Sequence, residues 1–464
     1  MTATLLLVAV VNPGPLQSRR RLILACLSLS CALPVLITAR AIAPLSGLDK
    51  NRKRVFAHYM VAWPRGGRQA SIESYRSEMR DAHARGIDGF ALNCGGWHRS
   101  EPQYKQRVMS MYEAAGSLDF DFTLFVSADG HAQDEIDDIV ESTRGLKAQL
   151  RMDGKPVLSA YAAGGKGFSN GAALIDHARR LGAFFVPHFF PETGERLITP
   201  VAADQIVQRL GTADGYFYFG AAGLPELIAD SVESLGPELR AHGKLFMAPV
   251  TPYYRGLPAG TNYRAFETEG FSGMAAEWEA AIASNASWVQ IVTWNDWAES
   301  TYVAPLPMPA GAAGRAHVYD DRFGELPSHA AYLDASAYYI QWFKTGKQPA
   351  ILRDQLFYFY RLNPPASAAG TPPQSQTPLS TRIHVSVFLT APATLIVQLP
   401  GADSDRQIDV HVGITHLSVD SRAGRPRFVL KRQGKRIIDK SGEQPITDDD
   451  SSGAYNYFSG SAQA

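Results

Sequence analysis

Short apolar runs recur along the chain, and each is followed by a longer segment whose apolar residues have helical spacing. Most of these runs are continuous rather than alternating, which is typical of parallel strands covered on both faces. We therefore predict parallel strands at eight runs, residues 55–61, 89–93, 120–127, 156–161, 183–188, 215–219, 244–250 and 288–294.

The intervening segments have the pattern of amphipathic helices. Residues 71–85 and 272–284 carry apolar side chains on one helical face, and Gly86 and Gly182 stand where helices should end. Eight strand–helix units predict an α/β fold, a (β/α)8 TIM barrel over residues 52–350 whose last helix covers 331–344. An open doubly wound sheet is the alternative.

The pattern changes after residue 350. Residues 351–380 are interpreted as a connecting segment, because 364–380 are rich in Pro, Ser, Ala and Thr. In residues 381–464 apolar and polar positions alternate, which predicts a small C-terminal antiparallel β-sandwich domain. Such a domain either braces the barrel or binds glycan.

The first 43 residues have the pattern of a signal peptide. Three arginines, Arg19 to Arg21, precede an apolar run over 22–39, and small residues near Ala41 and Ala43 offer cleavage sites. The basic triplet also suits a twin-arginine signal, and an uncleaved run is about long enough to anchor the chain in a membrane. We expect a secreted, periplasmic or cell-envelope protein that contacts a membrane only if the segment remains.

Charge and cysteine content exclude several classes of protein. Lys plus Arg and Asp plus Glu both number 45, so the chain lacks the excess of positive charge that is typical of nucleic-acid-binding proteins. Of the three cysteines, Cys26 and Cys31 lie in the signal segment, so a mature chain keeps Cys94 and forms no internal disulfide. We find no metal-ligand spacing and no phosphate-binding loop, and we expect a monomer.

Candidate chemistry gathers at the predicted carboxyl ends of the strands, where barrel enzymes carry their active sites. Two acids, Asp296 and Glu299, follow the last strand and stand among tryptophans in "IVTWNDWAESTYV". Burying two carboxyls there carries a desolvation cost that a merely structural loop could avoid. Aromatic, amide and acidic residues at the other strand ends are candidates for substrate binding, namely His58, Tyr59, Asn93, Trp97, Asp129, Tyr161, His188, Tyr253, Trp294 and Asn295.

Several motifs resemble glycoside hydrolase family 71, the α-1,3-glucanases or mutanases. They are "VFAHYMV", "GIDGFALN" and "VQIVTWNDWAES", followed by "YYIQWFKTG", "LFYFYR" and "YNYFSGS", and the resemblance covers residues 55–464. It implies a (β/α)8 barrel with a C-terminal β-sandwich, and endo-hydrolysis of α-1,3-glucan with inversion. The family's catalytic acids then fall on Asp296 and Glu299. The chain departs from the family at Trp297, where Tyr is common, at Ala298, where Gly is common, and in the loop "CGGWHRS", which lacks acids.

Two alternatives remain open. "WNDWAES" also resembles the ending of family 99 endo-α-mannosidases and of WbsX-like domains, although those place Glu at position 296. The other alternative is a non-catalytic glycan-binding surface protein, against which the acid pair argues.

Glycoside hydrolysis needs one carboxylic acid that protonates the leaving oxygen and one carboxylate that activates water or attacks directly. It requires neither a metal nor an organic cofactor. Glu has the higher intrinsic pKa, ~4.3 against ~3.9 for Asp. We therefore expect Glu299 to be the acid and Asp296 the base.

Overall fold

The computed structural model describes residues 52–99, 103–163, 171–190, 197–257, 263–307, 314–363, 373–402, 404–447 and 456–464. The expected signal peptide, residues 1–43, lies outside these ranges. Within them, no helix has both the length and the apolar character needed to cross a membrane.

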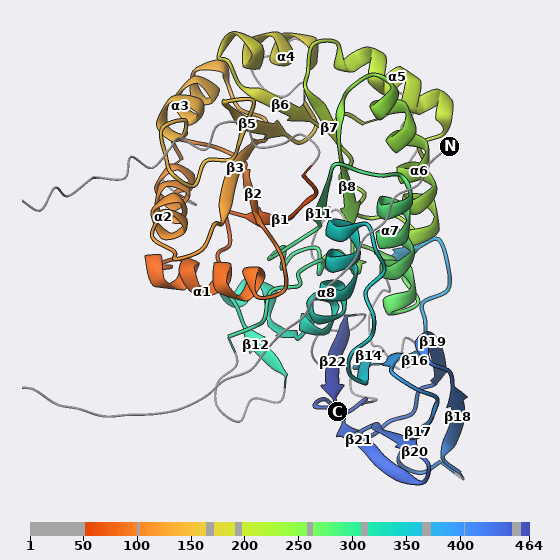
Figure 1. The fold of residues 1–464 in the computed structure, drawn as a ribbon. Coiled ribbons are helices and arrows are strands. Elements are labelled where there is room, and N and C mark those ends of the chain that lie inside the picture. Colours follow the sequence, from red (N-terminus) through yellow and green to blue (C-terminus); the bar gives the residue numbers. More distant parts are fainter. Residues whose placement is uncertain are drawn as a thin grey trace, which may run out of the picture. The chain divides into compact units, whose positions relative to one another are not determined.

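A curled sheet of parallel strands forms the centre of the fold (Figure 1). Each of the eight predicted strands is present, as β1 (Arg54–Met60), β2 (Gly89–Cys94), β3 (Thr123–Ala128), β5 (Lys155–Ala160), β6 (Phe184–Pro187), β7 (Gly215–Phe217), β8 (Leu245–Val250) and β11 (Trp288–Ile291). The short strand β4 (Arg151–Met152) pairs antiparallel with β5. The first and last parallel strands are neighbours, since β1 pairs with β11 in the register Ala57 to Ile291. Between β6 and β7, the Asp214 amide donates a 3.0 Å hydrogen bond to the Phe185 carbonyl.

Helices follow the strands and cover the outer face of this sheet (Figure 1). They are α1 (Ile72–His83), α2 (Tyr104–Gly116), α3 (Gln133–Thr143), α4 (Gly171–Arg180), α5 (Pro200–Leu210), α6 (Pro225–Ala241), α7 (Phe271–Ala283) and α8 (Ala330–Thr345). Helix α1 begins at a capping box, in which Ser71 accepts from the Ser74 amide. The predicted ends are confirmed: Gly86 and Gly182 lie just beyond α1 and α4 at φ of 91° and 69°, which glycine adopts without strain.

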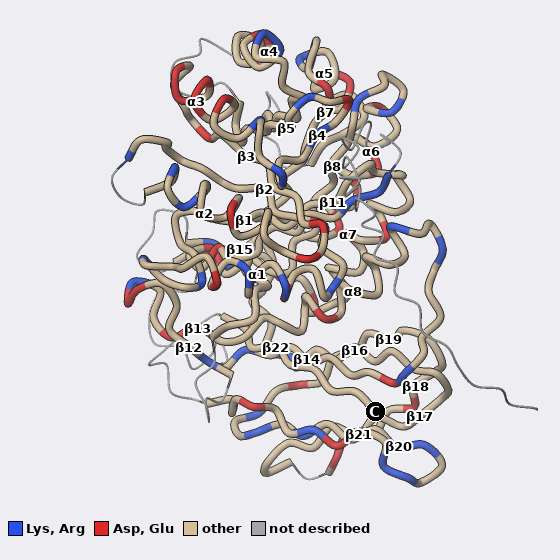
Figure 2. The backbone as a smooth tube through the Cα atoms, turned by 60° about the vertical axis from the view of Figure 1, so that its left-hand side comes forward, with Lys and Arg blue, Asp and Glu red and all other residues tan. Residues whose placement is uncertain are grey.

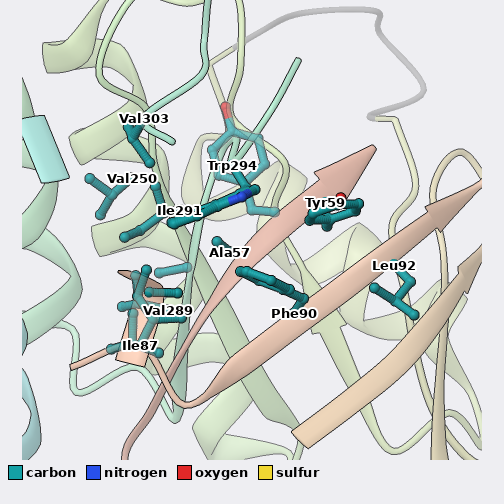
Figure 3. Close-up of a cluster of buried hydrophobic side chains, with 14 of the residues drawn as sticks. Ala57, Tyr59, Ile87, Phe90, Leu92, Val250, Val289, Ile291, Trp294 and Val303 are labelled. Atoms are coloured by element: carbon teal, nitrogen blue, oxygen red, sulfur yellow. The ribbon is translucent and has the colours of Figure 1, made fainter. Parts of the chain in front are cut away.

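The two faces of the sheet carry different side chains. On β1, Val55, Ala57 and Tyr59 belong to the cluster between sheet and helices, whereas Phe56 belongs to a separate inner cluster. Successive residues of a strand point to opposite faces, so His58 follows Phe56 inward. Figure 3 shows Ala57, Tyr59, Phe90, Leu92, Val289 and Ile291 packed together in the cluster with the helices.

Two antiparallel sheets of four strands make up the C-terminal part. One has the order β19 (Gly413–Asp420), β16 (Arg382–Leu389), β14 (Gln355–Arg361), β22 (Tyr457–Gln463), and the other β18 (Arg406–Val410), β17 (Ala393–Gln398), β20 (Arg427–Arg432), β21 (Lys435–Ser441). Strand β14 falls inside the segment 351–380 that we interpreted as a connection, because that segment was assigned from its Pro-rich second half. The strand belongs to the first sheet, where it pairs with both β16 and β22.

Strand β14 is buried on both faces and joins the two parts of the chain. Leu356, Tyr358 and Tyr360 belong to the core shared by the two antiparallel sheets. Phe357 and Phe359 belong instead to the large cluster that includes α7 and α8. In the view of Figure 2, Lys and Arg alternate with Asp and Glu along the described residues of both parts.

The remaining elements lie in the loops after the last strands. Strands β9 (Tyr254–Arg255) and β10 (Arg264–Phe266) form a short antiparallel hairpin beside β15 (Gln374–Ser375). Strands β12 (Arg315–His317) and β13 (Glu325–Pro327) pair around the 3-10 turn Asp321–Phe323.

Candidate active site

Five of the predicted substrate-binding residues stand at the carboxyl ends of neighbouring strands, on the side of each strand that carries the inner cluster. Each lies two or four positions beyond an inner-cluster residue of its own strand, so the alternation of side chains points it to the same face. The five are His58, Asn93, Asp129, Tyr161 and His188. Because all parallel strands end at the same edge of the sheet, these side chains meet there.

Aromatic rings connect three of these strand ends. The rings of Tyr161 and His188 are stacked, with centroids 5.0 Å apart and planes within 2°. Phe219 lies edge-on to Tyr161 at 4.9 Å and to His58 at 5.0 Å. Burial lowers the pKa of both histidines to about 3, so both rings are neutral near pH 7.

Asp129 is held by its neighbours on three strand ends. Its carboxyl accepts hydrogen bonds from the Asn93 amide group, from the Ser127 hydroxyl at 3.1 Å and from the Tyr161 backbone N–H at 2.8 Å. Burial raises the pKa of this carboxyl to about 7, although the three hydrogen bonds act in the opposite direction. A carboxyl that titrates near neutrality at a strand end is a candidate for function.

Asp296 and Glu299 lie together beyond β11. The Glu299 amide donates a 3.0 Å hydrogen bond to Asp296 Oδ1, and the Tyr254 hydroxyl donates to Glu299 Oε1 at 3.1 Å. Asp296 is buried, with 6% of its surface exposed, whereas Glu299 is half-buried. Burial, followed by the nearby Glu299 carboxylate, raises the pKa of Asp296 well above its usual value.

The pair interacts electrostatically with the other strand-end residues. Burial raises the pKa of the Tyr161 phenol to about 12, and Glu299 and Asp129 both add to the effect. Burial also raises the pKa of Tyr254, with contributions from Glu299, Asp296 and Tyr161. The three carboxyls and the two phenols therefore share one region.

The backbone around the pair is fixed to the end of β1. Asn295 Oδ1 accepts from the Met60 amide at 2.7 Å, and its Nδ2 donates to the carbonyls of Met60 and Trp63 at 3.1 and 3.0 Å. The Trp297 indole donates to the Trp63 carbonyl at 2.9 Å. These three hydrogen bonds of the Asn295 side chain all join backbone groups, and they fix the position of the neighbouring Asp296.

Two predicted residues, Tyr59 and Trp294, lie on the opposite face of the sheet. Both are fully buried in the cluster with the helices, where Figure 3 shows them near Phe90. The Tyr59 hydroxyl and the Trp294 indole both donate to the carboxyl of Glu78 on α1, at 3.0 and 2.7 Å.

The side chains of Trp97 and Tyr253 contact α3 and β22. The Trp97 indole donates to Asp138 on α3 at 2.8 Å, and its side chain is buried. Tyr253 packs edge-on against Tyr457 of β22 at 4.8 Å. Asp214, another acid near a predicted strand end, precedes β7 and so stands at the other end of the sheet.

Two residues of the site region, Tyr254 and Phe190, and one residue that supports it from α1, Glu78, were absent from the predicted set. Tyr254 follows Tyr253 in "TPYYRG", and the sequence gives no reason to prefer the second tyrosine. Phe190 is 54% exposed, although its ring lies edge-on to Tyr161 and His188 at 5.6 and 4.9 Å. Glu78 sits within a helical pattern, where an acid is ordinarily solvated.

Comparison with known proteins agrees with the motifs. Glucan endo-1,3-alpha-glucosidase agn1 of Schizosaccharomyces pombe is 26% identical over 91% of this chain and 97% of that protein. Mutanase Pc12g07500 of Penicillium rubens is 26% identical over 93% of both chains. An ascus wall endo-1,3-alpha-glucanase of Schizosaccharomyces pombe is 24% identical over 87% of this chain and 96% of that protein.

Among solved structures, the GH99 endo-alpha-mannosidase from Bacteroides thetaiotaomicron aligns with a TM-score of 0.45 and 17% identity, covering 65% of this chain and all of that chain. A similarity of that size does not by itself assign a fold. The model of glycosyl hydrolase family 71 matches residues 51–464, which include all of the described elements. The chain therefore belongs to glycosyl hydrolase family 71.

Proposed function

We propose that this chain is an endo-acting hydrolase of α-1,3-glucan and that Asp296 and Glu299 carry out the hydrolysis. One observation carries the proposal: Asp296, which is buried, and Glu299, which is half-buried, lie together beyond β11 at the carboxyl end of the parallel sheet, where the Glu299 amide donates to the Asp296 carboxyl. The names of three relatives that align over most of the chain support the choice of substrate.

The protonation of the pair suits acid–base catalysis. Burial and the nearby Glu299 carboxylate raise the pKa of Asp296 well above its usual value, which favours the protonated form of Asp296 beside an ionised neighbour. A hydrolase with two carboxyls needs one in the acid form and one ionised. We propose that Glu299, the more exposed of the two, protonates the leaving oxygen and that Asp296 orients the attacking water, with inversion at the anomeric carbon. The raised pKa of Asp296 favours the reverse assignment, in which Asp296 is the acid, and the two assignments are distinguished by experiment.

The surrounding residues are proposed to bind the sugar. Asp129 and Asn93 supply acceptors and donors for hydroxyl groups, and the stacked rings of Tyr161 and His188 offer an apolar wall. His58 is a neutral ring whose Nδ1 accepts a 3.0 Å hydrogen bond from Gln290 Nε2. Tyr59, Trp97, Tyr253, Trp294 and Asn295 act by supporting the fold rather than by touching sugar.

The same proposal includes the architecture and the location. We propose that the curled sheet closes between β6 and β7 into a (β/α)8 barrel, and that the two antiparallel sheets form a β-sandwich over 355–464. We further propose that residues 1–43 direct export and are removed, and that the mature protein is a monomer acting outside the cytoplasm. The ascus wall glucanase among the relatives supports an extracellular substrate.

Product analysis tests the proposal. Wild-type protein is incubated with α-1,3-glucan, α-mannan and α-1,4-glucan, and NMR follows the anomer released first. We expect soluble oligosaccharides of inverted configuration from α-1,3-glucan alone. Asp296→Asn and Glu299→Gln should each fold and lose roughly 10²-fold or more in kcat. Asp409→Asn, at an exposed carboxyl on β18, is the matched control. Release from α-mannan alone would favour the family 99-like alternative, and no release from any substrate would favour a glycan-binding protein.

A further inference from the structure

The hairpin β9–β10 holds Glu299 at two points. The Tyr254 hydroxyl donates to Glu299 Oε1 at 3.1 Å, and the Arg255 amide donates to the Glu299 carbonyl at 2.9 Å. Both donors belong to β9, which pairs with β10 through Ala265 and Phe266. The orientation of the Glu299 carboxyl therefore depends on where this hairpin sits.

One side chain from the C-terminal sheets contacts both ends of the hairpin. Arg361, the last residue of β14, donates from Nη1 to the Tyr253 hydroxyl at 3.4 Å and from Nη2 to Glu267 Oε1. Tyr253 immediately precedes β9, and Glu267 immediately follows β10. Arg361 thus links the start and the end of the same hairpin.

Further contacts keep Arg361 in this position. Its Nε donates to the Ser380 carbonyl at 3.2 Å, and its guanidinium lies 4.3 Å from the centre of the Tyr457 ring. The Tyr457 hydroxyl donates to the second carboxyl oxygen of Glu267 at 2.5 Å. The Arg361 side chain is only 3% exposed. A planar guanidinium that bonds several partners fixes their positions relative to one another, whereas a flexible lysine ammonium does not.

We propose that Arg361 is a positioning residue of the hydrolase. From β14 it clamps the two ends of hairpin β9–β10, and through Tyr254 it sets the orientation of the Glu299 carboxyl. This inference rests on the proposed function for the role of Glu299. It makes the C-terminal sheets a part of the catalytic unit, in contrast to a separable glycan-binding module.

Arg361→Lys tests the clamp, with Arg432→Lys as the matched control. Arg432 makes a two-point ion pair with Asp354 in the same sheets, at 2.8 and 2.9 Å, and also donates to the carbonyls of Ala391 and Pro392, at 2.7 and 3.2 Å. We expect both variants to lose thermal stability. Arg361→Lys alone should lose roughly 10-fold to 100-fold in kcat with little change in KM, the scale of a small misplacement of a catalytic group. Equal kcat values for the two variants would overturn the proposal.

The pH–rate profile and a double variant separate positioning from general loosening. Tyr254→Phe removes a donor to a carboxylate, which disfavours the ionised form, so its profile should move to higher pH. Arg361→Lys should move the profile in the same direction, and Arg361→Lys/Tyr254→Phe should lose no more kcat than the worse single variant. Losses that multiply would show that Arg361 does not act through Tyr254.

Two further measurements keep the test decisive. If Arg361→Lys does not fold, Tyr253→Phe removes one partner of the clamp and should shift the profile in the same direction; an unchanged profile would count against the clamp. If wild-type protein does not cleave α-1,3-glucan, hydrogen exchange of the Tyr254 and Arg255 amides is compared among the variants. Faster exchange in Arg361→Lys than in Arg432→Lys would support the clamp even though the proposed function had failed, and equal exchange would reject it.

Discussion

The Trp294 indole donates a 2.7 Å hydrogen bond to the carboxyl of Glu78, which lies 216 residues earlier on α1. Glu78 is fully buried and also accepts from the Tyr59 hydroxyl at 3.0 Å. Burial raises the pKa of Glu78, and its two donors act in the opposite direction. The bond ties the segment that carries Asp296 to the first helix of the fold.

Removal of the Glu78 carboxyl should destabilise the protein. Glu78→Ala leaves two buried donors without an acceptor and opens a cavity, so we expect a loss of about 3 kcal/mol in the free energy of unfolding. Glu78→Gln should lose only about 1 kcal/mol, because its carboxamide can accept from Trp294 and donate to the Tyr59 oxygen. Urea unfolding measures both. Glu73→Ala, at an exposed acid of α1, should change little, and similar losses for all three variants would contradict a specific role of the carboxyl.

The placement of Tyr59 and His58 explains what the sequence could and could not predict. Runs such as 55–61 are apolar at nearly every position, so strands are readily predicted, but the run does not reveal which residues point inward. Period-two alternation within β1 places His58 inward with Phe56 and Tyr59 outward with Ala57. The alternation does not predict which face Trp294 lies on, because β11 ends at Ile291 and the regular alternation stops there. Tyr253 and Arg361 meet only through tertiary contacts, which no local pattern encodes.

The stability contributed by Asp129 should depend on pH. Its pKa in the folded protein is about 7, above the ordinary value of 3.8. Between these values the folded protein holds a proton that the unfolded chain has lost, so the stability from this residue is present at low pH and lost as the pH rises toward 7. A difference of one bound proton between the folded and unfolded states changes the free energy of unfolding by at most about 1.4 kcal/mol per pH unit.

Asp129→Asn cannot titrate and should remove that slope. Thermal or urea unfolding between pH 4 and pH 7 measures the difference between variant and wild type. Asp409→Asn, an exposed acid that accepts a 2.9 Å bond from Thr394, is the control and should follow the wild-type curve. Parallel curves for Asp129→Asn and wild type would mean that Asp129 is ionised throughout this range.

Phe190 should contribute to substrate affinity more than to turnover. Its ring is 54% exposed and stands beside the Tyr161–His188 stack, so a sugar ring can cover it. Covering half of a phenylalanine contributes about 1 kcal/mol, which corresponds to a roughly fivefold higher KM in Phe190→Ala. Leu352, 88% exposed and outside this region, gives the control Leu352→Ala. Equal KM values for the two variants would exclude Phe190 from substrate contact.

The division of roles between Asp296 and Glu299 can be tested with a substrate that needs no acid. A leaving group of low pKa, such as dinitrophenolate on an α-1,3-linked oligosaccharide, departs without protonation. If Glu299 is the acid, Glu299→Gln loses roughly 10²-fold or more in kcat on glucan but about tenfold or less on the activated substrate. Asp296→Asn should lose activity on both substrates, because water must still be activated.

Since the Tyr254 hydroxyl donates to Glu299 and the Glu299 amide donates to Asp296, each amide replacement disturbs its neighbour. The comparison between the two substrates within one variant cancels that disturbance. If the activated substrate restored the kcat of Asp296→Asn and not that of Glu299→Gln, Asp296 would be the acid and Glu299 the base. Near wild-type turnover of glucan by both variants would show that neither residue is catalytic.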